Sequence, residues 1–79
     1  MDKRLKVLLA EVFNVRESEI EPELKKEDVG SWDSLKQMDL VISLEKEYAI
    51  ALEIPDILKM NSVSCIVEVL KSKGVTFGD

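Results

Sequence analysis

One serine stands where its hydroxyl could take part in chemistry. Ser34 follows Asp33 at the expected start of an amphipathic helix, where backbone N–H groups have no acceptors within the helix. An anion attached there is stabilised by those donors and by the positive end of the helix dipole. The sequence has no histidine to activate the hydroxyl, so Ser34 is a poor catalytic nucleophile. It is a better candidate for modification by another enzyme, and the alternative is a plain capping residue.

The composition argues against several classes of function. The 79 residues include 16 Asp and Glu against 11 Lys and Arg, and this net charge of −5 argues against binding to nucleic-acid phosphates. The single cysteine, Cys65, excludes an internal disulfide and a multi-cysteine metal site. We expect Cys65 to lie in the core or just below the protein surface. The acidic residues of the first loop lack EF-hand spacing, so no metal is expected. The chain is not expected to be an enzyme.

The sequence also lacks the apolar stretches that targeting and membrane insertion require. The residues after Met1 are charged, and no apolar run has the length of a signal peptide or of a membrane span. We therefore expect a cytoplasmic protein that does not insert into membranes.

Apolar spacing predicts an all-α fold. Leu5, Leu8, Leu9 and Val12 follow the i, i+3, i+4, i+7 pattern of an amphipathic helix, which Asn14 is expected to end. Because the pattern is local and the chain is short, a bundle of short helices is the fold that uses it best.

The second helix is expected from Ser34 to Tyr48. Asp33 is the candidate N-cap, although Ser34 and Gln37 also fit an S-x-x-Q capping box. Pro55 suits the first turn of a short third helix.

A last helix is expected to begin after Asn61 or Ser62 and to end at Gly74. Residues 15–33 show no sustained helical period and predict a long ordered loop, with Trp32 as one anchor. The other expected anchors are Ile20, Leu24 and Val29. The predicted fold is a single domain over residues 1–79, a small four-helix bundle with three main helices and a short third helix.

The second helix is apolar on two sides. One apolar arc consists of Leu40, Val41, Leu44 and Tyr48. The other arc is centred about 140° away on the helical wheel and consists of Leu35, Met38 and Ile42. If one arc faces the core, the other lies in solvent and indicates a binding surface. The alternative is that helices pack on both sides.

These residues together resemble the acyl carrier protein family. The sequence D-S-L opens the second helix at Asp33–Leu35, and M-D-L at Met38–Leu40 and L-E-K-E-Y at Leu44–Tyr48 follow it. The similarity extends over nearly the whole chain. It implies that Ser34 is esterified with 4′-phosphopantetheine, whose thiol carries acyl groups as thioesters. It also implies that Asp33 is recognised by the transferase that attaches this arm.

The resemblance implies a non-catalytic carrier that delivers acyl intermediates to fatty-acid, polyketide or related biosynthetic enzymes. Its implied partners are a phosphopantetheinyl transferase, acyl-loading enzymes, and acyl-transfer or condensing enzymes. The carrier itself is expected to be a monomer. The partner-binding residues would be Leu35, Lys36, Met38, Asp39, Ile42, Glu45 and Lys46. By analogy with the family, the acyl chain would be lined by Leu40, Leu44, Ile57, Leu58 and Met60. An aminoacyl, D-alanyl or peptidyl carrier, and an unmodified helical adaptor, are the alternatives.

Two departures from the family pattern leave the pathway open. Gly30 stands three residues before Asp33 instead of two, with Trp32 in a W-D-S-L sequence that resembles specialised stand-alone carriers as much as housekeeping ones. Lys36 and Lys46 occupy positions where the fatty-acid pattern has acids. We therefore expect generic fatty-acid elongation enzymes to act poorly on this carrier.

Overall fold

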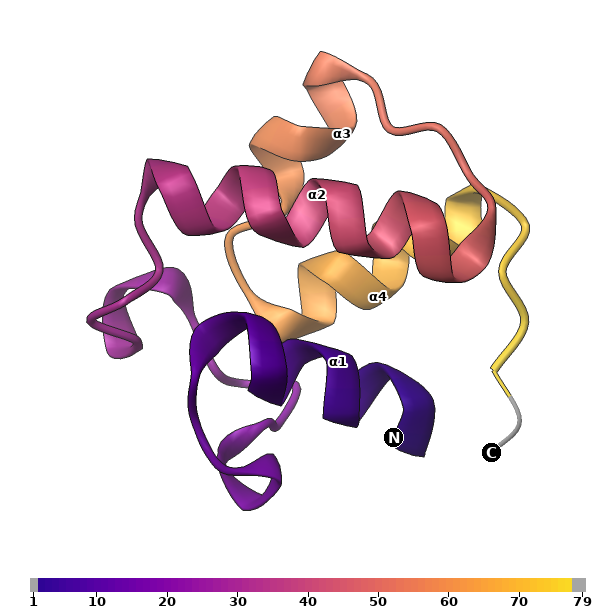
Figure 1. Ribbon diagram of the computed structural model, residues 1–79. Coiled ribbons are helices and arrows are strands. Elements are labelled where there is room, and N and C mark those ends of the chain that lie inside the picture. Colours follow the sequence, from indigo (N-terminus) through magenta and orange to yellow (C-terminus); the bar gives the residue numbers. More distant parts are fainter. Residues whose placement is uncertain (1, 78–79) are drawn as a thin grey trace.

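Four α-helices form the computed structural model, which describes residues 2–77 (Figure 1). The helices are α1 (Lys3–Phe13), α2 (Ser34–Tyr48), α3 (Ile54–Lys59) and α4 (Val63–Ser72), and two short 3₁₀ turns, η1 (Glu17–Glu19) and η2 (Lys26–Asp28), lie between α1 and α2. The longest helix, α2, crosses the middle of the molecule, with α1 below it and α3 above it in this view. The predicted all-α fold with a short third helix is confirmed.

The helices begin where the capping residues predict. The carboxylate of Asp33 accepts a hydrogen bond of 2.9 Å from the backbone N–H of Lys36, and Ser62 Oγ accepts one of 3.2 Å from Cys65. Asp33 and Ser62 are thus the N-caps of α2 and α4. The alternative S-x-x-Q capping box of α2 does not form, because the amide of Gln37 bonds elsewhere.

The ends of α1 and α4 also follow the sequence. Asn14 caps α1 in the left-handed conformation, with φ of 56°, which asparagine tolerates better than most residues. Gly74 adopts φ of 89° directly after the cap residue of α4, a conformation that an L side chain rarely adopts.

All three long helices contribute to one core, together with the first loop. The fully buried side chains are Leu5, Leu9, Phe13, Ile20, Leu40, Leu44, Met60, Val63, Ile66 and Leu70. From the loop, Trp32 is only 3% exposed and stacks on Phe13, with 4.3 Å between the ring centroids. Ile20 and Val29 are buried as well, and Leu24 packs against the core. The prediction of an ordered loop anchored by these residues is confirmed.

Backbone hydrogen bonds fasten this loop to the start of α4. The N–H of Lys26 donates to the carbonyl of Asn61 at 2.9 Å, and the N–H of Val63 donates to that of Leu24 at the same distance. Nearer α2, Ser31 Oγ donates to the carbonyl of Phe13 at 2.8 Å. The chain therefore enters α2 from a fixed direction.

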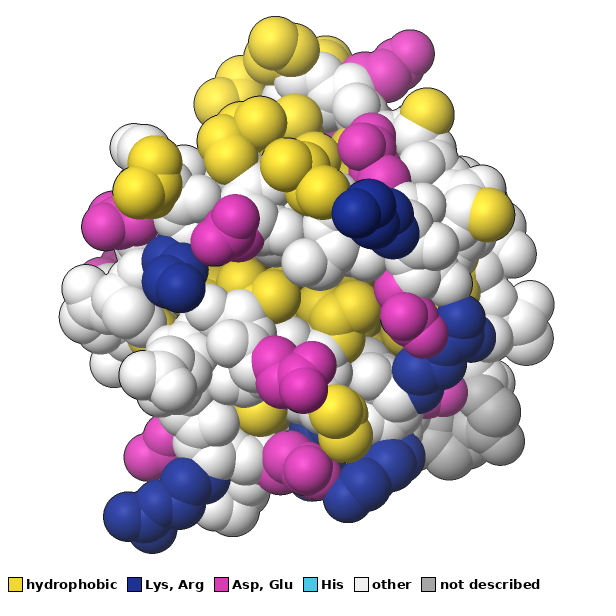
Figure 2. Space-filling view, in the orientation of Figure 1, with side chains coloured by type: hydrophobic (Ala, Val, Ile, Leu, Met, Phe, Trp, Pro, Cys, Tyr) yellow, Lys and Arg dark blue, Asp and Glu magenta, His cyan; other side chains and the backbone are white. Residues whose placement is uncertain are grey.

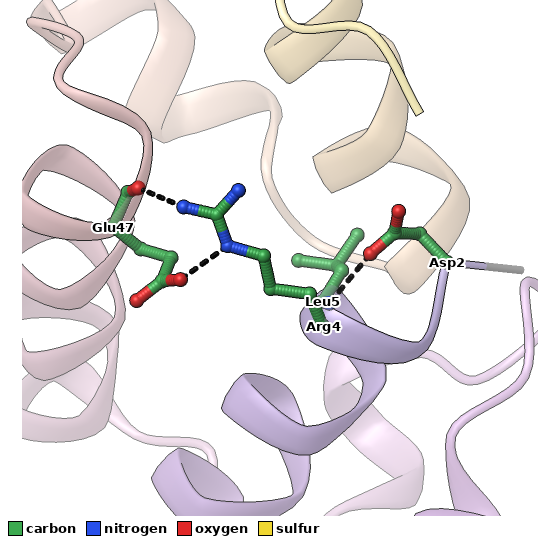
Figure 3. A network of polar contacts seen from close by, with 4 residues as sticks. All are labelled: Asp2, Arg4, Leu5 and Glu47. Atoms are coloured by element: carbon green, nitrogen blue, oxygen red, sulfur yellow. Dashed lines mark hydrogen bonds and ion pairs between the residues drawn. The ribbon is translucent and has the colours of Figure 1, made fainter. Parts of the chain in front are cut away.

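A polar network joins the beginning of α1 to the end of α2 (Figure 3). The guanidinium of Arg4 pairs with the carboxylate of Glu47 and donates through Nη2 to the Glu47 carbonyl at 2.6 Å. It also lies 4.8 Å from the ring centroid of Tyr48, within the range of a cation–π contact. At the same end of α1, Asp2 accepts a hydrogen bond from Leu5 as the N-cap.

An ion pair holds the short helix α3 against α4. Lys73 Nζ lies 2.7 Å from Asp56 Oδ2, and both side chains are largely buried. The hydrogen bond from Lys73 is the main cause that lowers the pKa of Asp56, and the backbone N–H of Glu53 lowers it further. Because the folded pKa lies below the unfolded one, the pair stabilises the fold above about pH 4, and this contribution is lost as the pH falls through the folded pKa.

We expect Lys73→Met to lower the free energy of unfolding at pH 7 and to lower it much less at an acidic pH below the folded pKa of Asp56, where this carboxyl is protonated in both proteins. Urea titrations of the two proteins at both pH values measure this difference. Lys71→Met is the matched control, since Lys71 is an exposed lysine in the last turn of α4, two residues before Lys73. Equal effects of Lys73→Met at both pH values would show that the ion pair does not stabilise the fold.

Candidate functional site

Ser34 is the first residue of α2, and its side chain is exposed. The side chain of Asp33 accepts from the N–H of Lys36, and the carbonyl of Asp33 accepts from the N–H of Gln37. Within the described part of the chain, the N–H groups of Ser34 and Leu35 have no acceptor. An oxyanion attached to Ser34 would therefore meet free donors and the positive end of a 15-residue helix.

The surroundings of Ser34 suit attachment rather than catalysis. The sequence has no histidine, and the neighbouring carboxylate of Asp33 is engaged as the helix cap. The exposed hydroxyl can thus be reached by another enzyme, which would have to supply the base that removes its proton. These features fit a phosphodiester at Ser34, since they combine an accessible oxygen with donors for the phosphate oxygens.

An exposed apolar patch begins directly beside Ser34. Leu35, Met38 and Ile42 of α2 are 79%, 52% and 49% exposed. Ile54 and Leu58 of α3 are more than two-thirds exposed as well. Figure 2 shows yellow apolar side chains gathered over α3 and the adjoining side of α2. The predicted solvent-facing arc of α2 is confirmed, and a patch of this kind is typical of a surface that binds other proteins.

The opposite arc of α2 faces the core. Leu40 and Leu44 are fully buried, Met60 is 1% exposed, and Ile57 is half-buried against them. The prediction that Leu58 lines an acyl chain at the seam between α2 and α3 stays a prediction, and its side chain lies mostly in solvent. Leu58 is 75% exposed, because the six-residue helix α3 turns one face inward and Leu58 lies on the other.

The charged residues of α2 differ in their exposure and in their contacts. A hollow of about 690 Å³ between α1 and α2 is lined by Arg4, Val7, Leu8, Glu11, Val12, Lys36, Asp39, Ser43, Lys46 and Glu47. Lys36 is half-buried in this hollow, whereas Asp39 and Lys46 are exposed. Glu45, which the resemblance assigns to partner binding, is half-buried, and its carboxylate accepts a 2.8 Å hydrogen bond from the N–H of Leu52 that holds the α2–α3 loop.

Gln37 has a role at this site that was missed from the sequence, which indicated this residue only as part of a capping box. Its side chain is half-buried between α2 and α3 and bonds to three residues, one in the loop before α2 and two at the end of α3. The available signal was its place on the helical wheel, close to Leu44 on the core-facing side, where a polar side chain needs internal partners.

Residues 2–77 lack the features of a metal site and of a membrane span. Within them, no three His, Cys, Asp or Glu side chains gather in a group that could hold a metal ion. No helix in that range is long and apolar enough to cross a membrane.

Known proteins share this architecture and this site. Residues 3–70 match the family model described as the phosphopantetheine attachment site. The chain is 31% identical over 70 residues to an acyl carrier protein of Thermotoga maritima, covering 89% of this chain and 86% of that protein. The solution structure of a holo acyl carrier protein from Geobacter metallireducens matches with a TM-score of 0.78 and 27% identity, over 89% of this chain and 80% of that one. The chain therefore belongs to the acyl carrier protein family, in which 4′-phosphopantetheine is the covalently attached cofactor.

Proposed function

We propose that this protein is a non-catalytic acyl carrier whose 4′-phosphopantetheine is attached to Ser34 Oγ. When attached, this group supplies the thiol on which an acyl group is held as a thioester. The observation that carries the proposal is the exposed hydroxyl of Ser34 on the first residue of α2, beside the capping carboxylate of Asp33.

The residues around Ser34 have separate roles in this proposal. Ser34 provides the ester oxygen, and the modifying transferase removes its proton. The carboxylate of Asp33 does not serve as the base, because it accepts the hydrogen bond from the N–H of Lys36 that caps α2. The N–H groups of Ser34 and Leu35 would be available to donate hydrogen bonds to the phosphate oxygens. Asp33 fixes the start of α2 and is the residue that the transferase recognises.

The exposed apolar patch is the proposed docking surface for the enzymes that load and receive the acyl group. Leu35, Met38 and Ile42 supply its part on α2, next to the point of attachment. On the helical wheel, Asp39 and Lys46 follow Leu35 on the side of α2 that faces the hollow, and they carry opposite charges. Docking here would bring the arm on Ser34 to the partner's active site. The pathway we propose is fatty-acid, polyketide or related acyl biosynthesis, served by dedicated partners.

Intact mass spectrometry tests the proposal. The purified protein is incubated with coenzyme A and a promiscuous phosphopantetheinyl transferase, and its mass is expected to rise by one phosphopantetheine. Proteolysis should then place the gain on the peptide that contains Ser34. An unchanged mass with several transferases would contradict the carrier function and would favour an unmodified helical adaptor.

Partner choice should depend on Lys46 more than on Lys36. Both lysines line the hollow between α1 and α2, but Lys46 is exposed and lies about 20° from Leu35 on the helical wheel, whereas Lys36 is half-buried and lies about 100° from Leu35. Generic fatty-acid enzymes offer basic groups to an acidic second helix, so Lys46 repels them and slows association. We expect Lys46→Glu to raise kcat/KM for acyl transfer by a generic condensing enzyme at low salt.

The gain should fade as salt rises, because salt screens exposed charges. Lys36→Glu is the matched control and should produce a smaller gain. If Lys46→Glu leaves kcat/KM unchanged at every ionic strength, Lys46 does not set partner choice.

A further inference from the structure

The side chain of Gln37 closes the junction between α2 and α3, one helical turn from Ser34. Its Oε1 accepts a hydrogen bond of 2.6 Å from the indole Nε1 of Trp32. Its Nε2 donates to the carbonyls of Ile57 and Met60, at 3.1 and 3.2 Å. One amide thus joins α2 to the loop before it and to the C-terminal end of α3.

These contacts use both N–H groups of the amide and its carbonyl oxygen. The indole they engage belongs to Trp32, which is 3% exposed and stacked on Phe13, so it is held in place independently of Gln37. Separating Gln37 from its partners would leave the indole N–H and the Met60 carbonyl unpaired at a partly buried junction, which is unfavourable, whereas the Ile57 carbonyl would keep the backbone N–H of Met60.

The interior behind Gln37 is filled. Leu40 and Leu44 of α2 are fully buried, and Met60 is 1% exposed. An apolar chain that enters between α2 and α3 from Ser34 must break the hydrogen bonds of Gln37 and also displace packed side chains. A long chain offers apolar burial in return, whereas a short or polar group offers almost none.

We propose that Gln37 closes the bundle to apolar chains and that this carrier presents a short or polar acyl group outside the bundle. This inference rests on the proposed attachment at Ser34. It assigns Gln37 as the residue that decides which class of acyl group the carrier holds, although Gln37 takes no part in attachment.

The test compares two loaded forms of the protein. A promiscuous transferase installs the arm from acetyl-coenzyme A or from octanoyl-coenzyme A, and intact mass confirms each product. The midpoint of thermal unfolding and the rate of thioester cleavage by hydroxylamine are then measured. In the wild-type protein, the octanoyl and acetyl forms should unfold at the same temperature and be cleaved at the same rate.

In Gln37→Leu, the polar contacts are replaced by an apolar side chain of similar size. The octanoyl form of this variant should unfold about 4–8 °C above its acetyl form, the shift typical of modest added stabilisation in a domain of this size. Its thioester should also be cleaved more slowly. Gln37→Met is the second variant, with an unbranched side chain that repacks easily. Leu58→Ala is the matched control, since Leu58 lies on the exposed side of α3.

Two results would overturn the proposal. One is a wild-type protein whose octanoyl form is stabilised and protected from hydroxylamine, because the bundle then admits the chain despite Gln37. The other is a pair of folded Gln37 variants whose octanoyl and acetyl forms behave alike, because Gln37 is then not the barrier. Failure of the arm to attach at Ser34 is seen directly in the mass and counts against the proposed function instead.

Discussion

Replacing Ser34 by alanine should abolish the mass gain from coenzyme A and a phosphopantetheinyl transferase while leaving the helical fold unchanged. The side chain of Ser34 is exposed, and the N-cap of α2 is Asp33, so the hydroxyl is not needed for folding. The free energy of unfolding should change by less than about 0.5 kcal/mol, as is usual for exposed positions. Circular dichroism and urea titration check the fold, and intact mass checks the modification.

Ser64→Ala is the matched control for this experiment. Ser64 is also an exposed serine in the first turn of a helix, since α4 begins at Val63. Its surroundings differ from those of Ser34, because Ser62 Oγ lies 3.2 Å from its hydroxyl and no D-S-L sequence precedes the helix. We expect Ser64→Ala to accept the arm as the wild type does. If the Ser34→Ala protein is still fully modified, the arm is attached to another residue and the assignment of Ser34 is overturned.

Replacing Trp32 by alanine should cost the fold about 3–5 kcal/mol, as truncation of a buried aromatic residue usually does. The indole is buried, stacks on Phe13 and donates to Gln37, so its apolar burial and both of these contacts are lost together. A domain of this size has a free energy of unfolding near the lower end of the usual range of about 5–15 kcal/mol. Trp32→Ala should therefore be largely unfolded at 37 °C, as circular dichroism would show.

Trp32→Phe separates the packing of this residue from its hydrogen bond. Phenylalanine retains an aromatic ring against Phe13 but leaves Gln37 Oε1 without its donor, which should cost about 1–3 kcal/mol. Ile54→Ala is the matched control, because Ile54 is apolar but 70% exposed and should be nearly neutral. A Trp32→Ala protein as stable as Ile54→Ala would show that the loop does not anchor α2.

The start and the two sides of α2 could be predicted from the sequence because the relevant interactions are local. Asp33 caps its own helix through a residue three positions on, so the chain alone specifies that bond. The two apolar arcs follow from 100° steps along one helix, and the structure places Leu40 and Leu44 inside and Leu35 outside. Ser34 stands out for the same reason, as a serine at the end of a helix dipole.

The roles of Leu58, Glu45 and Gln37 required the tertiary structure. In a six-residue helix, adjacent apolar residues do not define which face turns inward, and packing placed Ile57 inside and Leu58 in solvent. The carboxylate of Glu45 bonds to Leu52, seven residues away across a turn whose path no local pattern specifies.

The sequence by itself determined the helices, their caps, the exposed arc of α2 and the position of Ser34, since each depends on residues within a few positions of one another. Only the tertiary structure decided how the bundle is closed beside that serine. The partners of Gln37 lie 20 and 23 residues away in α3 and at its end, and Asp56 meets Lys73 across two helices. Such contacts depend on how the helices pack, because helical periodicity specifies which face is apolar but not which neighbour covers it.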